Sequence, residues 1–292
     1  MNDTQNNTPF VDFFCKSVPF NLVMLRRKIK DTFFLDPRCN EIAETEIGEY
    51  IRSNMVLGNY KYSLYSDVSG HIKVSKKNKM LFVNIGKNAS SKVLQTAIEE
   101  LTGKKFSNRE EYMWYRDHWY GHVEKEIKIE KEITSLIADP SYFKFTFVRN
   151  PYSRLVSAWK NRIQDKSSII HNIGYYRDIR KYSFAQLVDF LYEHKDDSTY
   201  FDRHWWPQHI AMFHPLIEYD FVGKIENFNG DYAFVLKKIN ASENAFNSIT
   251  QKVNATKPSR LMSFYTDELQ AKVYEIYKKD FDLLGYSYEL PQ

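Results

Sequence analysis

Hydrophobic and polar residues follow one another along the chain in a pattern that predicts two strand–loop–helix units. Residues 80–85, MLFVNI, form the short apolar run of a buried strand, and residues 92–101 carry apolar side chains at helical spacing. The plan is repeated by YFKFTFV at residues 142–148, which predicts a strand, and by residues 151–163, which predict a helix. That helix begins with a proline directly after Asn150, a strong start signal. Two such units predict an α/β fold with a central parallel sheet flanked by helices.

Further elements are predicted around these two units. Residues 60–67 and 71–75 flank a glycine-containing turn and predict a β-hairpin, and residues 219–225 predict a third strand. Helices are expected at residues 124–137, 184–193 and 267–284. Thr266 and Gly285 are suited to begin and end the last of these helices.

The composition is that of a soluble globular protein. Hydrophobic residues make up 43% of the 292 positions and charged residues 27%, which excludes a fibrous or disordered chain. The formal net charge of +4 suits an anionic ligand but is too small for a nucleic-acid-binding surface. The two cysteines, Cys15 and Cys39, allow at most one disulfide and have no zinc-site spacing, which favours a reducing compartment.

The N-terminal region is not expected to cross a membrane. It lacks the basic residues of a signal peptide, and the apolar run at residues 20–25 is far shorter than the roughly 20 residues that a transmembrane helix needs. Residues 20–30 predict either an ordinary amphipathic surface helix or a basic helix that contacts a membrane peripherally.

The loop at residues 86–91, GKNASS, has the make-up of an anion-binding site. It follows a predicted strand and precedes a predicted helix, so successive backbone N–H groups and the helix dipole would face a bound anion. Lys87 adds a full positive charge, and the hydroxyl groups of Ser90 and Ser91 extend the set of donors. The alternative is an ordinary strand-to-helix turn with an exposed lysine.

A nucleoside triphosphatase is the main rival interpretation of this loop. Its phosphate loop requires the pattern G-x-x-x-x-G-K-[ST], with a hydroxyl group that reaches Mg²⁺. Here Gly86 directly precedes Lys87 and Asn88 follows it, so the loop is too short and lacks that hydroxyl group. The second strand ends in Arg149, where a metal-binding aspartate would be expected. The two loops therefore predict an anionic ligand and no metal.

Arg149 and Ser157 form the second candidate site. An arginine at the end of a strand can donate two parallel hydrogen bonds to a phosphate. Ser157 follows Asn150 by two helical turns, so it lies on the same side as the start of the helix. A single serine on a helix is usually just solvated, so Arg149 and Ser157 indicate a phosphate site only in combination with the loop at residues 86–91.

At these motifs the sequence resembles sulfotransferases that use 3′-phosphoadenosine 5′-phosphosulfate (PAPS). Residues 86–91 resemble their 5′-phosphosulfate loop, and FVRNPYSRLVSAW at residues 147–159 resembles their 3′-phosphate motif, which is a very specific match. Within that family the resemblance is to Golgi carbohydrate sulfotransferases of the chondroitin 4-O and HNK-1 type, sulfotransferase family 2. It continues through His204 and Trp205, YDFVGKIE at residues 219–226, and YEIYKKDF at residues 274–281.

The resemblance implies a three-layer, P-loop-like sulfotransferase fold over residues 79–292, with residues 1–78 as an N-terminal extension of short helices and a hairpin that packs on it. It implies PAPS as the donor and a hydroxyl group of a carbohydrate as the acceptor, without a metal. The residues that it assigns to the donor are Gly86, Lys87, Asn88, Ala89, Ser90, Ser91, Arg149, Ser157, Lys257 and Arg260. The last two lie in a basic loop that would close over the nucleotide, with a charged surface loop as the alternative.

In-line transfer of a sulfuryl group needs a fixed cation and a general base. Lys87 is the candidate that stabilises charge on the transferred group. Histidine is the default base because its pKa lies near neutrality. The candidates are His118, His122 and His204. An ordinary surface or core role is the alternative for each, and Glu110 or Glu111 would be the base if none of the three is.

Two departures from the Golgi relatives bear on where the protein resides. Residues 212–216, before the third strand, lack the cysteine pair that those relatives carry. Asn88-Ala89-Ser90 is a glycosylation sequon inside the donor loop, where a glycan would block the site. Both features favour a cytoplasmic, bacterial member of the family.

Two other functions stay open on the sequence alone. A nucleotide-triphosphate-dependent small-molecule kinase would share the phosphate-binding loops. A non-catalytic nucleotide- or glycan-binding protein would keep the pockets without the base. The sequence defines neither the acceptor sugar nor the oligomeric state.

Overall fold

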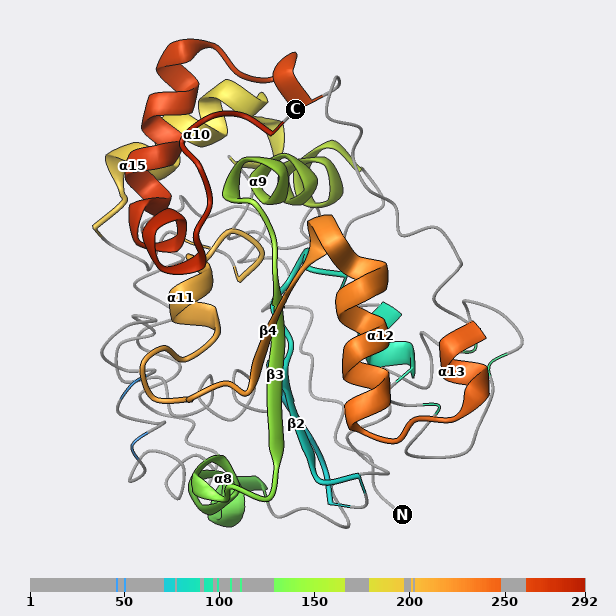
Figure 1. The fold of residues 1–292 in the computed structure, drawn as a ribbon. Helices are drawn as coiled ribbons and strands as arrows, with labels where there is room; N and C mark the ends of the chain where they lie inside the picture. Colours follow the sequence, from blue (N-terminus) through green and yellow to red (C-terminus); the bar gives the residue numbers. More distant parts are fainter. Residues whose placement is uncertain are drawn as a thin grey trace, which may run out of the picture.

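A computed structural model of the chain (Figure 1) describes residues 46, 50, 71–76, 78–89, 92–96, 99, 106, 111, 129–165, 179–196, 201, 203–247 and 261–291. The predicted strand at residues 60–67 and the basic loop at residues 252–260 lie outside these residues. The described part includes the strands of both predicted units and the loops that follow them up to Ala89 and Asn150.

Four strands form a small, mostly parallel sheet. They are β1 (Ile72–Ser75), β2 (Met80–Val83), β3 (Phe143–Val148) and β4 (Phe221–Lys224), and they lie in the order β1-β2-β3-β4. β2, β3 and β4 run parallel, with Phe82 opposite Phe145 and Thr146 opposite Val222. The three strands predicted after residue 79 and their parallel arrangement are confirmed.

β1 forms a hairpin with β2. Among the described residues β1 pairs with β2, which runs antiparallel to it. The predicted pairing of residues 71–75 with residues 60–67 lies outside the described residues. In the connecting turn Lys79 has a left-handed φ of 47°, and Asn78 N donates a hydrogen bond to Ser75 Oγ (3.1 Å). All four residues of β1 are buried by this arrangement. A polar turn without glycine thus forms a hairpin of β1 and β2 that the sequence analysis did not predict.

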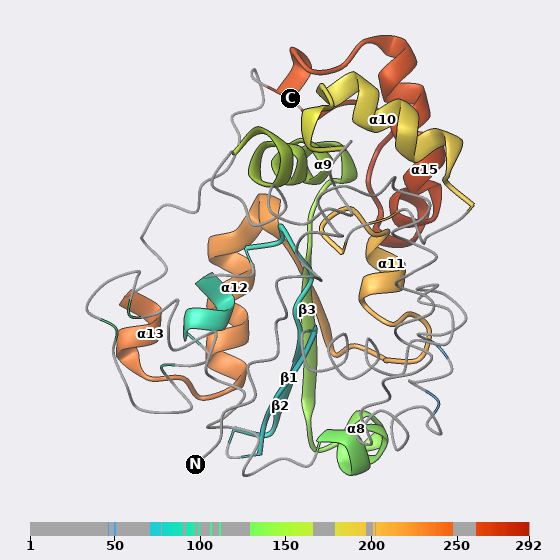
Figure 2. The same ribbon diagram turned by 180° about the vertical axis from the view of Figure 1, so that it is seen from behind.

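Helices cover both faces of the sheet (Figure 1, Figure 2). α12 (Phe228–Lys238) lies on one face, where the rings of Phe147 and Tyr232 have centroids 5.9 Å apart. α11 (Gln208–Ala211) lies on the opposite side, and Trp206, just before it, is buried in the main core. The sheet is therefore a middle layer between helical elements.

Three further helices gather at the carboxyl ends of the parallel strands (Figure 1). They are α9 (Pro151–Trp159), α10 (Phe184–Glu193) and α15 (Asp267–Leu284). The predicted caps are confirmed: Asn150 Oδ1 accepts a hydrogen bond from Tyr152 N (3.0 Å), and Thr266 Oγ1 accepts one from Leu269 N (3.3 Å). Gly285 ends α15 with a φ of 64°, a conformation that glycine adopts without strain.

The remaining described elements are a π-helix, one helix before β3 and three short helices. α9 runs on into a π-helix, η1 (Lys160–Gln164), one residue beyond the predicted end. α8 (Ile129–Ala138) precedes β3 at the other end of the sheet and overlaps the helix predicted at residues 124–137. The shorter elements are η4 (Ile179–Lys181), η6 (Ile225–Asn227) and α13 (Glu243–Asn247). In the described part of the chain, no helix combines the length and the apolar character needed to cross a membrane.

Candidate functional site

The loops that follow β2 and β3 meet at the carboxyl end of the sheet. Asn88 Nδ2 donates a hydrogen bond to the carbonyl oxygen of Phe147 (2.8 Å), and Arg149 Nη1 donates one to the carbonyl oxygen of Lys87 (3.4 Å). Parallel neighbouring strands end at the same edge, which brings together residues that are 59 and 62 positions apart in sequence. The two anion-binding motifs of the sequence therefore form one site.

The loop after β2 turns tightly through unusual backbone conformations. Lys87 and Ala89 have left-handed φ angles of 72° and 53°. Non-glycine residues adopt this conformation rarely, and such residues cluster at ligand sites. Gly86 lies against the segment before α11, since a Cβ atom added to it would be 3.5 Å from His204 Cδ2. His204 thus packs against the loop at Gly86.

Lys87 lies in a strongly positive environment. Its pKa falls from 10.5 to about 8, first because the ammonium group is buried and then because Arg149, Arg162 and Arg154 repel its charge. Burial also lowers the pKa of Arg149, and the carboxylate of Glu226 opposes that shift. The three guanidinium groups thus disfavour the charged form of Lys87. A bound anion would relieve the repulsion between them.

Arg149 is held in place by the start of α9. Its Nε donates a hydrogen bond to Ser153 Oγ (2.9 Å), and the next residue, Asn150, donates its backbone N–H to Glu226 Oε1 (2.8 Å). Ser157 is half-buried and lies one turn beyond Ser153 on the same side of the helix. Arg149 thus contacts the first turn of α9 through Ser153, and the pairing of Arg149 with Ser157 stays a prediction.

Arg154 is a member of this site that the sequence analysis missed. Its side chain is buried, with Nε donating to the carbonyl oxygen of Gly86 (3.1 Å) and Nη1 to that of Trp206 (2.6 Å). It thereby joins the loop after β2 to the segment before α11. A signal was present in the motif FVRNPYSR, because the helix dipole disfavours an arginine in the first turn unless it has a specific role.

The side chain of Asn88 supports the loop from within the protein. It is buried, and its Nδ2 donates to the carbonyl oxygen of Phe147 and to Gln208 Oε1, at 2.8 Å each. The amino group of Asn88 is thus used inside the protein, so we assign this residue to loop support. Gln208 is absent from the predicted site because the segment HWWPQH was interpreted through its histidines and tryptophans.

Of the candidate bases, His204 lies within the described residues, and His118 and His122 lie outside them. His204 lies against Gly86, as described above. The predicted site residues outside the described part are Ser90, Ser91, His118, His122, Lys257 and Arg260. His209, five residues after His204, is held by a 2.7 Å contact between its Nδ1 and Asp280 Oδ1. Within the described residues, no cluster of three side chains could ligate a metal ion.

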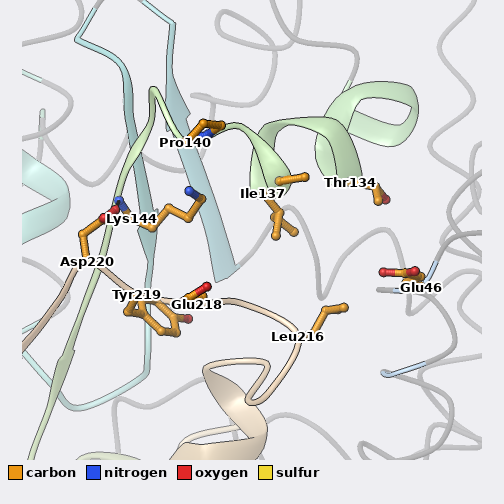
Figure 3. A pocket seen from close by; sticks show the side chains of 10 residues that line it. Glu46, Thr134, Ile137, Pro140, Lys144, Leu216, Glu218, Tyr219 and Asp220 are labelled. Carbon is orange, nitrogen blue, oxygen red and sulfur yellow. Dashed lines mark hydrogen bonds between the residues drawn. The ribbon is translucent and has the colours of Figure 1, made fainter.

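A separate cavity of about 480 Å³ lies at the other end of the parallel strands, between α8 and the segment before β4 (Figure 3). It is lined by Glu46, Thr134, Ile137, Ala138, Pro140, Lys144, Leu216, Glu218, Tyr219 and Asp220. Lys144 Nζ donates hydrogen bonds to the carbonyl oxygens of Asp139 (3.0 Å) and Tyr142 (3.4 Å). This cavity is distinct from the cationic site at the carboxyl ends of the strands.

Comparisons with known proteins agree with the motifs of the cationic site. The family described as "Sulfotransferase family" matches residues 70–287, well over half of the chain. Carbohydrate sulfotransferase 11 of Rattus norvegicus is 31% identical over 168 residues, which cover 50% of this chain and 47% of that protein. Carbohydrate sulfotransferase 12 of Xenopus laevis is 27% identical over 175 residues, which cover 50% of this chain and 40% of that protein.

The similarity is partial in extent. Carbohydrate sulfotransferase 8 of Homo sapiens is 28% identical over 174 residues, again 50% of this chain and 40% of that protein. The chain thus spans less than half the length of these curated relatives. No solved structure gave a significant match. The match to the family over residues 70–287 nevertheless includes both anion-binding loops and the segment before α11, and on this basis the chain belongs to the sulfotransferase family.

Proposed function

We propose that the protein transfers the sulfuryl group of PAPS to a hydroxyl group of a carbohydrate. The observation that carries this proposal is the junction of two anion-binding loops, in which Lys87, Arg149 and Arg154 are brought together and the two arginines lower the pKa of Lys87. The carbohydrate acceptor is supported by the names of the relatives, each a carbohydrate sulfotransferase.

The residues present fit a donor with two anionic ends. The loop after β2, with Lys87, would hold the 5′-phosphosulfate. Arg149, just before α9, and Ser157 on α9 would hold the 3′-phosphate, for which a guanidinium group is well suited. Ser90, Ser91, Lys257 and Arg260 stay predicted donor contacts. When bound, PAPS supplies an activated sulfuryl group.

The chain's own residues would then supply charge stabilisation and a base. Lys87, with a pKa of about 8 before the anion binds, is mainly protonated at neutral pH and becomes more so beside an anion. Its positive charge would stabilise negative charge that develops on the transferred group. His118, His122 or His204 would take the proton of the acceptor hydroxyl group, and the position of His204 beside Gly86 favours it among residues of known placement.

We further propose that the fold is the three-layer, P-loop-like sulfotransferase fold. It is supported by a parallel sheet with helices on both faces and by a phosphate-type loop directly after β2. The division into an extension at residues 1–78 and a domain at residues 79–292 is also a proposal. β1 belongs to the extension in this division and packs on the domain through its pairing with β2.

Residence in the cytoplasm of a bacterium is a separate proposal. It is supported by the segment at residues 212–216, which has no cysteine, and by the sequon at Asn88, whose side chain is buried. Cell fractionation of the native source, with an antibody against the protein, tests it. Recovery with membranes or in a secreted fraction would overturn this proposal and leave the chemistry unaffected.

The proposed reaction is tested by incubating the purified protein with sulfur-labelled PAPS and a panel of glycans, with phenolic and steroid alcohols for comparison. We expect label to move to one or more glycans when magnesium is chelated. Transfer of a labelled phosphoryl group from ATP instead would make the protein a kinase. Tight binding of the nucleotide and a glycan without transfer would favour the non-catalytic alternative.

A further inference from the structure

We propose that Gln208 is a positioning residue that sets the spacing between the two anion-binding loops, so that one donor molecule can reach both. This inference rests on the proposed function, because it concerns how the donor is held. Gln208 lies on α11, outside both loops, and its side chain is completely buried.

Three hydrogen bonds join the side chain of Gln208 to the loops. Its Oε1 accepts one from Asn88 Nδ2 (2.8 Å), in the loop after β2. The same oxygen accepts one from the backbone N–H of Arg149 (2.9 Å), and Nε2 donates to the carbonyl oxygen of Arg149 (2.8 Å). One amide group thus pairs with the main chain of one loop and with a side chain of the other.

Gln208 is itself fixed by α15. Asp280 Oδ2 accepts a hydrogen bond from the backbone N–H of Gln208 (2.6 Å), and its Oδ1 accepts from His209 N (2.8 Å). The carboxylate therefore caps the start of α11 from a different helix, and α11 lies beside α15 in both views (Figure 1, Figure 2). Asp280 is fully buried, so this anchor is shielded from water.

The physical consequence concerns ligands with two charged ends. A ligand that binds both loops gains affinity because, once one end is bound, the other end meets its loop at high effective concentration. That gain depends on the distance between the loops. A ligand with one phosphate engages one loop and is insensitive to the distance.

The first variant is Gln208→Met, which keeps the length of the side chain and removes all three hydrogen bonds. We expect the Kd of adenosine 3′,5′-bisphosphate to rise by about tenfold or more. The Kd values of adenosine 5′-monophosphate and adenosine 3′-monophosphate should each change by less than about threefold. Gln270→Met is the matched control, because Gln270 Nε2 bonds the carbonyl oxygen of Tyr288 (2.9 Å), away from the loops.

A second variant keeps the test available if Gln208→Met does not fold. Asn88→Ala removes the same link from the other side and should also weaken the bisphosphate selectively. In the double variant the two losses should not add, because each change breaks the same connection. Equal weakening of all three nucleotides, an unchanged Kd for the bisphosphate, or fully additive losses would overturn the role of Gln208.

The wild-type protein separates this proposal from the proposed function. If it neither binds the bisphosphate nor transfers the sulfuryl group, the proposed function fails. If it does both, and Gln208→Met loses no selectivity for the bisphosphate, only the positioning role fails.

Discussion

Buried positive charges at single residues decide what the site can bind. The guanidinium groups of Arg149 and Arg154 donate to the carbonyl oxygens of Lys87 and Gly86. A carbonyl dipole satisfies a hydrogen-bond donor without cancelling its net charge, so the repulsion that lowers the pKa of Lys87 persists. A bound anionic ligand would reduce this repulsion.

The depressed pKa of Lys87 predicts how ligand binding depends on pH. Lys87 loses its proton as pH rises through about 8, whereas the bound anion would keep it protonated. The affinity for adenosine 3′,5′-bisphosphate should therefore be highest below pH 8 and fall about tenfold between pH 7 and pH 9. Titration calorimetry at both pH values measures this change. Lys87→Arg stays charged throughout and should remove most of the dependence; an equally steep fall in that variant would assign the titration to another group.

Arg149 should act on only one end of the donor. Arg149→Ala is expected to raise the Kd of adenosine 3′,5′-bisphosphate by about 10- to 100-fold, the usual effect of losing a charge-assisted hydrogen bond. Adenosine 5′-phosphosulfate has no 3′-phosphate, so its Kd should change by less than about threefold. Competition binding with both nucleotides makes the comparison. Equal losses would show that Arg149 contacts the 5′ end or supports the whole loop.

The base should be revealed by a loss of turnover at nearly constant donor affinity. We expect one of His118→Ala, His122→Ala and His204→Ala to reduce kcat by about 100-fold or more while the Kd of the donor product changes only a few-fold. Lys87→Ala is the contrasting variant and should lose both turnover and donor affinity. The positive charge of Lys87 already contacts the anionic donor before the reaction begins. If all three histidine variants keep their turnover, the base is Glu110 or Glu111.

Residue roles were predictable where the chemistry is local to a motif. Lys87 and Arg149 follow strands directly, so their positions could be inferred from the sequence. The contacts of Gln208 and Arg154 could not, because their partners lie 59 and 68 positions away in sequence and no local spacing encodes such contacts. For Arg154, the first-turn arginine in FVRNPYSR marks the residue but not its partners. Only the folded chain shows that a buried amide and a buried guanidinium group hold the loops together.

Elements were predicted well where their ends carry local chemical signals. The caps at Asn150, Thr266 and Gly285 depend on hydrogen bonds within a few residues, and the bounds of α15 match the predicted ones. The pairing of β1 with β2 was not predicted, because the turn between them contains no glycine and gave no hairpin signal.

The contact between α15 and α11 predicts a large effect from one buried carboxylate. Asp280→Ala leaves the backbone N–H groups of Gln208 and His209 without their acceptor. The free energy of unfolding should fall by about 2–4 kcal/mol, since buried donors lose a charged partner. Urea denaturation followed by circular dichroism measures it. Asp282→Ala, an exposed position on the same helix, should change it by less than about 0.5 kcal/mol; similar losses in both variants would contradict the capping role.

On the scale of the whole molecule, the order of the strands places the site. Two successive parallel strands end side by side, so their loops meet at one edge without any long-range guidance. This explains why the position of the site followed from the sequence although the hydrogen bonds from Gln208 on α11 that support it did not. The cavity near α8 lies at the opposite end of the strands, and the sequence analysis assigned no site there, although Tyr219 and Asp220 in its lining belong to the motif YDFVGKIE.

Ligand-linked stability of the whole protein tests the kind of nucleotide that the site accepts. Adenosine 3′,5′-bisphosphate at about 100 times its Kd should add roughly 2.7 kcal/mol to the free energy of unfolding and raise Tm by about 5 °C. This shift should not need magnesium, because the charge is met by Lys87 and Arg149 and the loop after β2 lacks the hydroxyl group of a magnesium-binding phosphate loop. ATP with magnesium should shift Tm much less under matched conditions in differential scanning fluorimetry. A larger shift with ATP and magnesium would contradict the choice of donor and favour a kinase.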